Sequence, residues 1–163
     1  MPTGPGIFVA TVPLAGERLR RILAGHRVVA VMTLAEARQT LSREKFALAI
    51  LGVYFEESRM FELLSFVRGS AMNRDTPVVC VLGMRGTLSD ATIRSLEQAV
   101  NSIRGSVFLN LIAIPDDGPG NKLVRRYLER VLRARDASGA ATSGAVESPP
   151  APATRVPPGS AAP

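Results

Sequence analysis

The chain has 163 residues, of which 46% are hydrophobic and 21% are charged, and its formal net charge is +6. These values are typical of one globular domain with its own core. They exclude a membrane helix, since no apolar run approaches the roughly 20 residues that one needs, and the single cysteine, Cys80, excludes an internal disulfide.

The first half of the chain alternates apolar strands with amphipathic helices. Strands are expected at residues 7–11, 27–32 and 46–53, and helices at residues 14–24, 34–44 and 58–69. The run 46–53 shows no polar alternation, which indicates a strand covered on both faces. Gly25 is a typical helix stop, and Thr33 with Glu36 matches a capping box at the start of the second helix.

The second half continues the same alternation. Strands are expected at residues 77–82 and 106–114, and helices from Ser89 or Thr87 to about residue 104 and over residues 121–135. Five strands alternating with five helices predict a three-layer α/β fold, with a doubly wound parallel sheet.

Composition changes at residue 136. Ala, Ser, Gly and Pro dominate residues 136–163, and such a segment buries too little to offset the entropy of ordering it. We therefore expect a folded domain over residues 1–135 and a disordered tail over residues 136–163. The first apolar run, residues 7–14, is too short and wrongly flanked for a signal peptide, so we expect a cytoplasmic protein without membrane contact.

The stretch 46–68 resembles the centre of a response-regulator receiver domain, where a buried strand ends in an Asp that accepts a phosphoryl group. The positions that match this pattern are Leu51, Val53, Phe61, Glu62, Leu63, Leu64 and Arg68. The resemblance implies a flavodoxin-like sheet of order 2-1-3-4-5. Because the interval 83–114 is longer than the receiver pattern by about two helical turns of ~3.6 residues, we also expect an elongated fourth helix.

The resemblance also indicates where receiver chemistry is missing. Receivers place carboxylates after the first strand for a divalent metal, an acceptor Asp after the third, a hydroxyl after the fourth and a lysine after the fifth. The corresponding positions hold Thr11 and Val12, Gly52, Gly83 and Ile114. One surface histidine, His26, and one buried cysteine, Cys80, form no nucleophile–base pair. The sequence therefore predicts a degenerate, non-phosphorylatable receiver that is not an enzyme, with no catalytic residue, no cofactor and no metal.

Two other features of the strand ends were weighed as ligand sites. The acidic pairs 56–57 and 116–117 follow the third and fifth strands, but their spacing shows no convergence, and turn chemistry explains the second pair better. Gly83 and Gly86 match an anion-binding loop only weakly, so an ordinary turn is favoured.

The last helix is unusually basic, with six cations and one carboxylate over residues 122–135. A solvated face, an acidic protein partner and nonspecific nucleic-acid contact all fit this charge, whereas specific nucleic-acid recognition is not expected. In receivers, the face formed by the fourth helix, fifth strand and fifth helix mediates dimerisation and output. The residues expected to form such a face here are Lys122, Arg125, Arg126, Arg130 and Arg133.

These features predict a phosphorylation-independent signalling module that binds a protein partner or self-associates through this face. The alternative is a small-ligand binding domain. In that case a nucleotide or metabolite would occupy the crevice that Gly52 and Gly83 leave empty at the strand ends.

Overall fold

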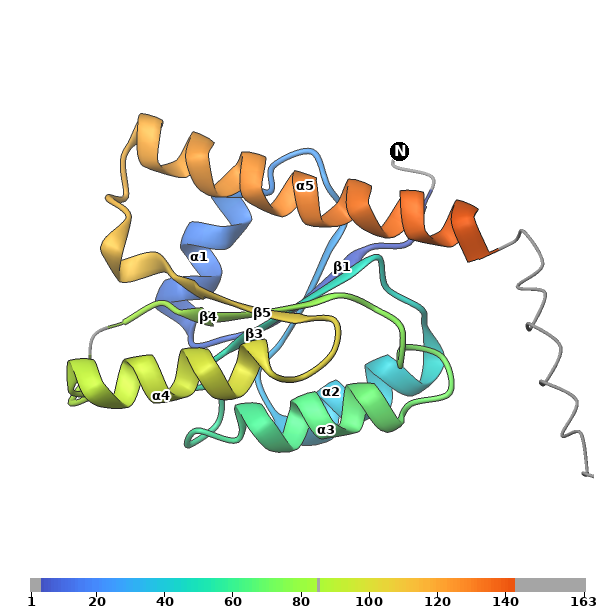
Figure 1. Ribbon diagram of the computed structural model, residues 1–163, viewed down its shortest axis with the longest axis horizontal. Helices are drawn as coiled ribbons and strands as arrows, with labels where there is room; N and C mark the ends of the chain where they lie inside the picture. The colour runs from blue at the N-terminus through green and yellow to red at the C-terminus, as the bar shows by residue number, and fades with distance from the viewer. Residues whose placement is uncertain (1–3, 85, 143–163) are drawn as a thin grey trace, which may run out of the picture.

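A computed structural model of the protein describes residues 4–84 and 86–142 (Figure 1). Strands and helices alternate along the chain, with one short 3₁₀ helix, η1, after the last strand. The elements are β1 (Ile7–Ala10), α1 (Pro13–Ile22), β2 (Val28–Val31), α2 (Leu34–Arg43), β3 (Leu48–Gly52), α3 (Met60–Gly69), β4 (Val78–Leu82), α4 (Asp90–Asn101), β5 (Ser106–Asn110), η1 (Leu111–Ala113) and α5 (Gly118–Thr142).

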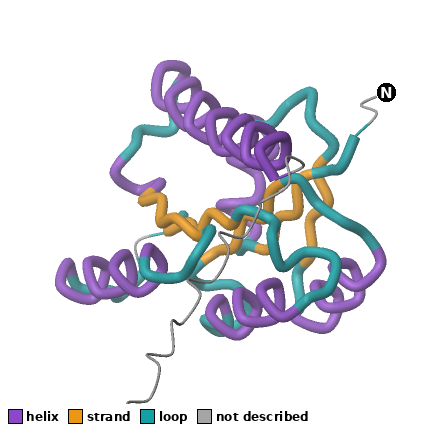
Figure 2. The backbone as a smooth tube through the Cα atoms, turned by 45° about the vertical axis from the view of Figure 1, so that its right-hand side comes forward, coloured by secondary structure: helices purple, strands orange, loops and turns teal. Residues whose placement is uncertain are grey.

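The five strands form one parallel sheet in the order β2-β1-β3-β4-β5, which confirms the predicted fold and strand order. Helices α1 and α5 cover one face of the sheet, and α2, α3 and α4 cover the other (Figures 1 and 2). The central strand is β3, and all its residues are buried. The carboxyl ends of the strands therefore meet at one edge of a covered sheet, where α/β proteins place their sites.

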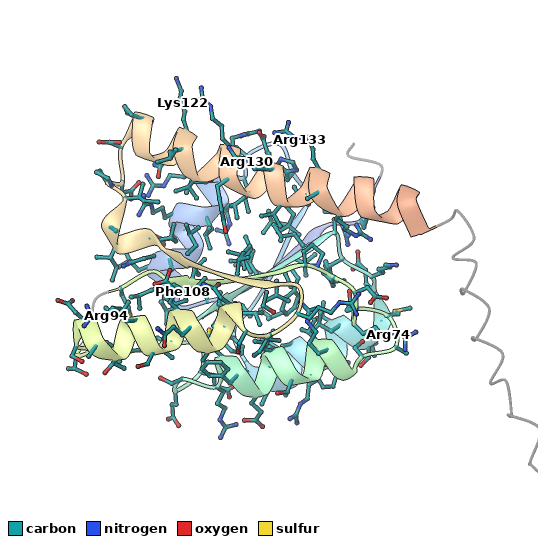
Figure 3. The ribbon with its side chains drawn as sticks, viewed as in Figure 1. Arg74, Arg94, Phe108, Lys122, Arg130 and Arg133 are labelled. Carbon is teal, nitrogen blue, oxygen red and sulfur yellow. The ribbon has the colours of Figure 1, made fainter. Side chains whose placement is uncertain are left out.

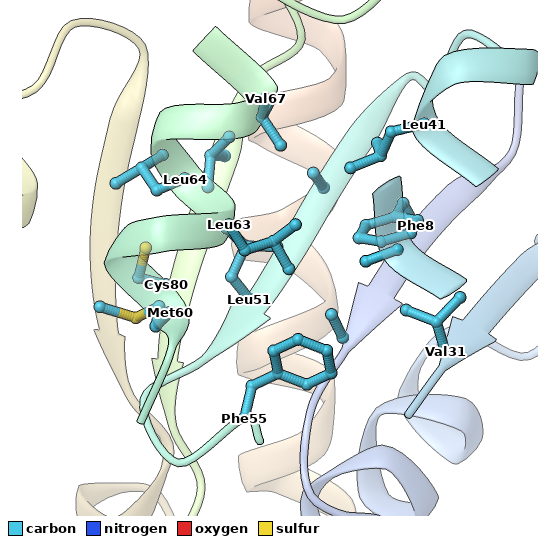
Figure 4. Packing of buried hydrophobic residues seen from close by; sticks show 14 of the residues in the cluster. Phe8, Val31, Leu41, Leu51, Phe55, Met60, Leu63, Leu64, Val67 and Cys80 are labelled. Carbon is cyan, nitrogen blue, oxygen red and sulfur yellow. The ribbon is translucent and has the colours of Figure 1, made fainter. Parts of the chain in front are cut away.

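Side chains of β3 explain why its sequence shows no polar alternation. Leu48 and Ile50 pack in the cluster beneath α1 and α5, whereas Ala49 and Leu51 pack in the cluster beneath α2, α3 and α4 (Figure 4). Since successive side chains of a strand point to opposite faces, a strand covered on both faces must be apolar throughout. Cys80 in β4 is fully buried, and its burial raises the pKa of the thiol to about 12.

Both predicted helix caps are present. The Thr33 side chain accepts a hydrogen bond from the Glu36 backbone N–H at 3.2 Å, while the Glu36 carboxylate accepts from the Met32 N–H at 3.0 Å. Of the two candidate caps for α4, Ser89 is the one that is used, because its hydroxyl accepts from the Thr92 N–H at 3.1 Å.

Several predicted boundaries were wrong, most clearly in the second half of the chain. Strand β5 ends at Asn110 rather than Ile114, because the Asn110 side chain accepts from the Ile112 N–H and starts η1. Helix α4 has twelve residues, against ten in each of α1, α2 and α3, but it ends at Asn101 rather than near residue 104. The additional chain between Gly83 and Ile114 is therefore shared between α4 and η1.

Helix α5 begins at Gly118 and continues to Thr142, through the first residues assigned to the tail. Residues 136–142 include three alanines, and alanine has the highest helix propensity. The remainder of the predicted tail, 143–163, lies outside the described residues. Within the described ranges, the helices lack the continuous apolar length that a bilayer crossing requires.

A buried amide ties the end of α2 to the start of β3. Asn73 is fully buried, and its Oδ1 accepts from the Phe46 N–H at 2.9 Å and from the Thr76 hydroxyl at 3.0 Å. Its Nδ2 donates to the carbonyls of Leu41 and Glu44, each at 2.8 Å. All four hydrogen-bonding positions of the amide are used, so this network fixes where the central strand enters the sheet.

We predict that Asn73→Ala lowers the free energy of unfolding by about 2–3 kcal/mol, because buried donors and acceptors lose their partner. Urea denaturation followed by circular dichroism measures this change. Ser42→Ala, which removes one exposed hydroxyl bond to the Arg38 carbonyl, is the control and should stay within about 0.5 kcal/mol of the parent chain. Equal midpoints for the two variants would contradict a structural role for Asn73.

Candidate functional site

The structure brings three of the residues singled out from the sequence to the same edge of the sheet. Thr11 directly follows β1, Gly52 is the last residue of β3, and Gly83 directly follows β4. Ile114 is not among them, because η1 separates it from the end of β5. The residue that ends β5 beside Leu82 is Asn110, which no sequence pattern singled out.

The space beside Gly52 is occupied by Thr11. A Cβ atom added at Gly52 would lie 3.1 Å from the Cα of Thr11 and 3.2 Å from its Cβ and Cγ2. Thr11 is itself 4% exposed, so its side chain is packed against the strand end rather than displayed to solvent. A side chain as large as aspartate could enter here only if the β1–α1 connection moved.

The space beside Gly83 is occupied by the first turn of α1. A Cβ atom added at Gly83 would lie 2.4 Å from the Cβ of Ala15, which is closer than two carbon atoms can approach without a shift of the backbone. Ala15 is buried at 3% exposure. Helix α1 therefore packs directly on the end of β4. This close contact is possible because Gly83 has no side chain.

An arginine of α1 holds the connection that follows β5. The Arg18 guanidinium donates to the carbonyls of Leu111 and Ile114 at 2.8 Å and Pro115 at 2.9 Å, and to Asn121 Oδ1 at 3.0 Å. Its side chain is 12% exposed. The sequence does not indicate this role, because Arg18 has the same spacing as any other cation on the polar side of an amphipathic helix.

The acidic pair after η1 shapes the start of α5. Asp117 Oδ1 accepts from the Gly120 N–H at 2.7 Å, in the first turn of the helix, as turn chemistry predicted. Asp116 accepts from Asn121 and from Arg21, each at 2.8 Å. These two hydrogen bonds, the one from Asn121 first, lower the pKa of the Asp116 carboxyl.

The other acidic pair belongs to a left-handed turn after β3. Glu56, Glu57 and Ser58 have φ values of 38°, 58° and 68°. The Glu56 carboxylate accepts the N–H of Leu34 at the first turn of α2, so it acts as a second cap for that helix. Among residues 4–84 and 86–142, no three His, Cys, Asp or Glu side chains gather closely enough to hold a metal ion.

Gly86, the second glycine of the loop after β4, lies against Tyr54. It has a φ of +52°, and an added Cβ would lie 1.9 Å from the Tyr54 hydroxyl oxygen. The left-handed backbone favours glycine at this position, and a larger residue would displace the Tyr54 hydroxyl.

The predicted basic residues of α5 do not all play the same part. Arg125 is half-buried, and it donates to the carbonyls of Ile22 and Ala24 at the end of α1 and to Glu129 at 2.9 Å. It therefore joins α5 to the end of α1, and its place on the interaction face stays a prediction. The other four cations are exposed, and we call them the α5 ridge: Lys122, Arg126, Arg130 and Arg133.

We predict that Gly83→Ala lowers the free energy of unfolding by about 1–3 kcal/mol through overpacking against Ala15. Combining it with Ala15→Gly should recover about 1 kcal/mol or more, relative to the sum of the single changes. Gly69→Ala is the matched control, since a Cβ there meets nothing within 4 Å, and it should not destabilise the chain. Strict additivity of the two variants in urea denaturation would contradict the contact.

No family model and no curated protein matches the chain at the level of sequence. Solved structures do match it. A receiver domain of a sensor histidine kinase from Pseudomonas aeruginosa, which holds a magnesium ion in its active-site cleft, superimposes with a TM-score of 0.59 at 14% identity. The match covers 83% of this chain and 99% of that one.

Two further structures give similar values. A receiver domain of a histidine kinase from Syntrophus aciditrophicus matches with a TM-score of 0.60 at 22% identity, over 80% of this chain and 92% of that one. An adenylate cyclase structure from Rhodopirellula baltica matches with a TM-score of 0.61 at 11% identity, over 87% and 100%. At these identities the likeness shows the fold alone, which is that of response-regulator receiver domains.

Proposed function

We propose that this chain is a signalling module on a receiver fold that acts by binding protein and accepts no phosphoryl group. The observation that carries the proposal is the packing of Thr11 beside Gly52 and of Ala15 beside Gly83. The receiver fold supports a signalling or regulatory role, and the filled strand ends argue against the usual chemistry of that fold.

Phosphoryl transfer to a receiver requires a carboxylate nucleophile and cations that offset the charge of the acyl phosphate. Gly52 has no side-chain oxygen at the acceptor position. Arg18 brings a cation to this edge, but its guanidinium already donates to three carbonyls and one amide oxygen. A phosphoryl group would therefore meet no attacking oxygen at Gly52, and at Arg18 it would meet a guanidinium that already makes four hydrogen bonds to the chain.

The same packing does not favour the small-ligand alternative. That alternative needs the crevice at the strand ends to be empty once the larger side chains are replaced by glycine. Instead, Thr11 and Ala15 lie where those side chains would project, and the Tyr54 hydroxyl lies against Gly86. The glycines have close neighbours where a side chain would project, and this does not favour a nucleotide or metabolite beside them.

The surface proposed for binding is formed by α4, β5 and α5. Figure 3 shows Phe108 of β5 between the two helices, with Arg94 on α4 and Lys122, Arg130 and Arg133 along α5. The outward N–H of Phe108 is already bonded to Asn101 Oδ1 at 3.0 Å. Because this edge amide is satisfied, a partner would be bound by side chains rather than by strand addition. The partner is a second protein or a second copy of the chain, in the cytoplasm.

Phosphoryl inertness is the first prediction. After incubation with acetyl phosphate and magnesium, intact-mass spectrometry should show no increase by one phosphoryl group, because Gly52 provides no acceptor. A receiver domain that retains its acceptor Asp, treated in parallel, is the positive control. A stable phosphoryl adduct on this chain would refute the proposal.

The second prediction concerns the binding surface. The double variant Arg126→Glu/Arg130→Glu should weaken the complex with a partner co-purified from the native cell, by about tenfold or more. Arg74→Glu, an exposed cation in the α3–β4 connection, is the matched control and should bind like the parent chain. Sedimentation at several concentrations tests self-association in the same variants. Unchanged binding and unchanged self-association would remove this face from consideration.

A further inference from the structure

The α5 ridge is a line of exposed cations. In the part of the chain that the structure describes, no carboxylate lies within ion-pair distance of Lys122, Arg126, Arg130 or Arg133. Arg125 on the same helix differs, because Glu129 neutralises it and the end of α1 accepts its remaining hydrogen bonds. The fold thus uses Arg125 in packing and leaves the four cations of the α5 ridge exposed.

The spacing of the ridge is regular. Its residues follow one another at intervals of four, four and three, so they lie on one side of the helix over three turns. At about 1.5 Å per residue, the four charges extend over roughly 16 Å of the helix. An anionic partner must therefore present several negative charges along a line of this length.

An exposed apolar side chain adjoins the ridge. Leu123 is 58% exposed, although its neighbour Val124 is fully buried against the sheet. Ile112 of η1 is a second exposed apolar residue, at 38%. The Arg18 guanidinium connects η1 to the first turn of α5, because it donates both to the Leu111 carbonyl and to Asn121 Oδ1. Phosphate backbones offer nothing to cover such side chains, whereas a protein segment with apolar and acidic residues does.

We infer that the α5 ridge binds an acidic amphipathic helix of a partner protein, whose carboxylates pair with the ridge while an apolar side chain covers Leu123. This inference rests on the proposed function and adds the chemical class of the partner. The positive charge of the ridge favours a partner with carboxylates, and the exposed Leu123 favours a protein over a nucleic acid.

A designed peptide tests the inference on the full-length chain. The probe is a fluorescently labelled helix of about 18 residues, long enough to span the ridge at about 1.5 Å per residue, with glutamates at intervals of four, four and three and one adjoining leucine. Its control peptide has glutamine in place of each glutamate. Fluorescence anisotropy should show binding of the acidic peptide only, and that binding should weaken as salt is added.

Three variants test whether the peptide binds at the α5 ridge. Arg126→Glu/Arg130→Glu should weaken peptide binding by about tenfold or more, and Leu123→Ser should weaken it without altering its salt dependence. Arg74→Glu should leave it unchanged. Circular dichroism confirms that each variant keeps the parent fold.

Each remaining outcome overturns the inference. These outcomes are no binding of the acidic peptide, equal binding of the glutamine peptide, or loss of binding in Arg74→Glu. Tighter binding of a short DNA duplex that depends on the same arginines would assign the ridge to nucleic acid instead. If a co-purified partner binds normally to the ridge variants, this inference fails while phosphoryl inertness and partner binding stand.

Discussion

Close seating of α1 on the carboxyl ends of the strands is the constraint on which the rest of this structure depends. Ala15 meets Gly83 and Thr11 meets Gly52 at distances that a larger residue on the strand side would not allow. This seating places Arg18 within reach of the carbonyls after β5. In an α/β sheet the same edge normally forms a crevice for ligands. Here Thr11 and Ala15 lie close to the glycines at the ends of β3 and β4.

Arginines from both α1 and α5 join the two helices near the start of α5. Arg18 of α1 bonds the residues that lead into α5, and Arg125 of α5 bonds the last carbonyls of α1. Each guanidinium donates to two or more backbone carbonyls of the other layer element or its flanking chain. Arg18 and Arg125 thereby hold α1 and α5 together as one layer. They differ from the exposed cations of the α5 ridge, which we propose for partner binding.

The sequence was sufficient for the parts of the fold that depend on local pattern. The unbroken apolar run of β3 and the cap at Thr33 needed no information from elsewhere in the chain, whereas the strand order came only from the resemblance to receivers. The end of β5 at Asn110 could not be predicted, because a side-chain bond to the Ile112 N–H decides it. Nor could the different roles of Arg18 and Arg125, since a cation becomes a clamp only when tertiary packing brings carbonyls to it.

The turn after β3 couples two segments that are distant in sequence. Glu56, Glu57 and Ser58 each hold a left-handed backbone that L-residues with side chains adopt at a cost of order 1 kcal/mol. The carboxylate of Glu56 also completes the first turn of α2 through Leu34. Because one carboxylate serves both segments, loss of that bond would free the turn and remove a cap from α2 together. We therefore expect the amide hydrogens of the two segments to exchange with solvent in step.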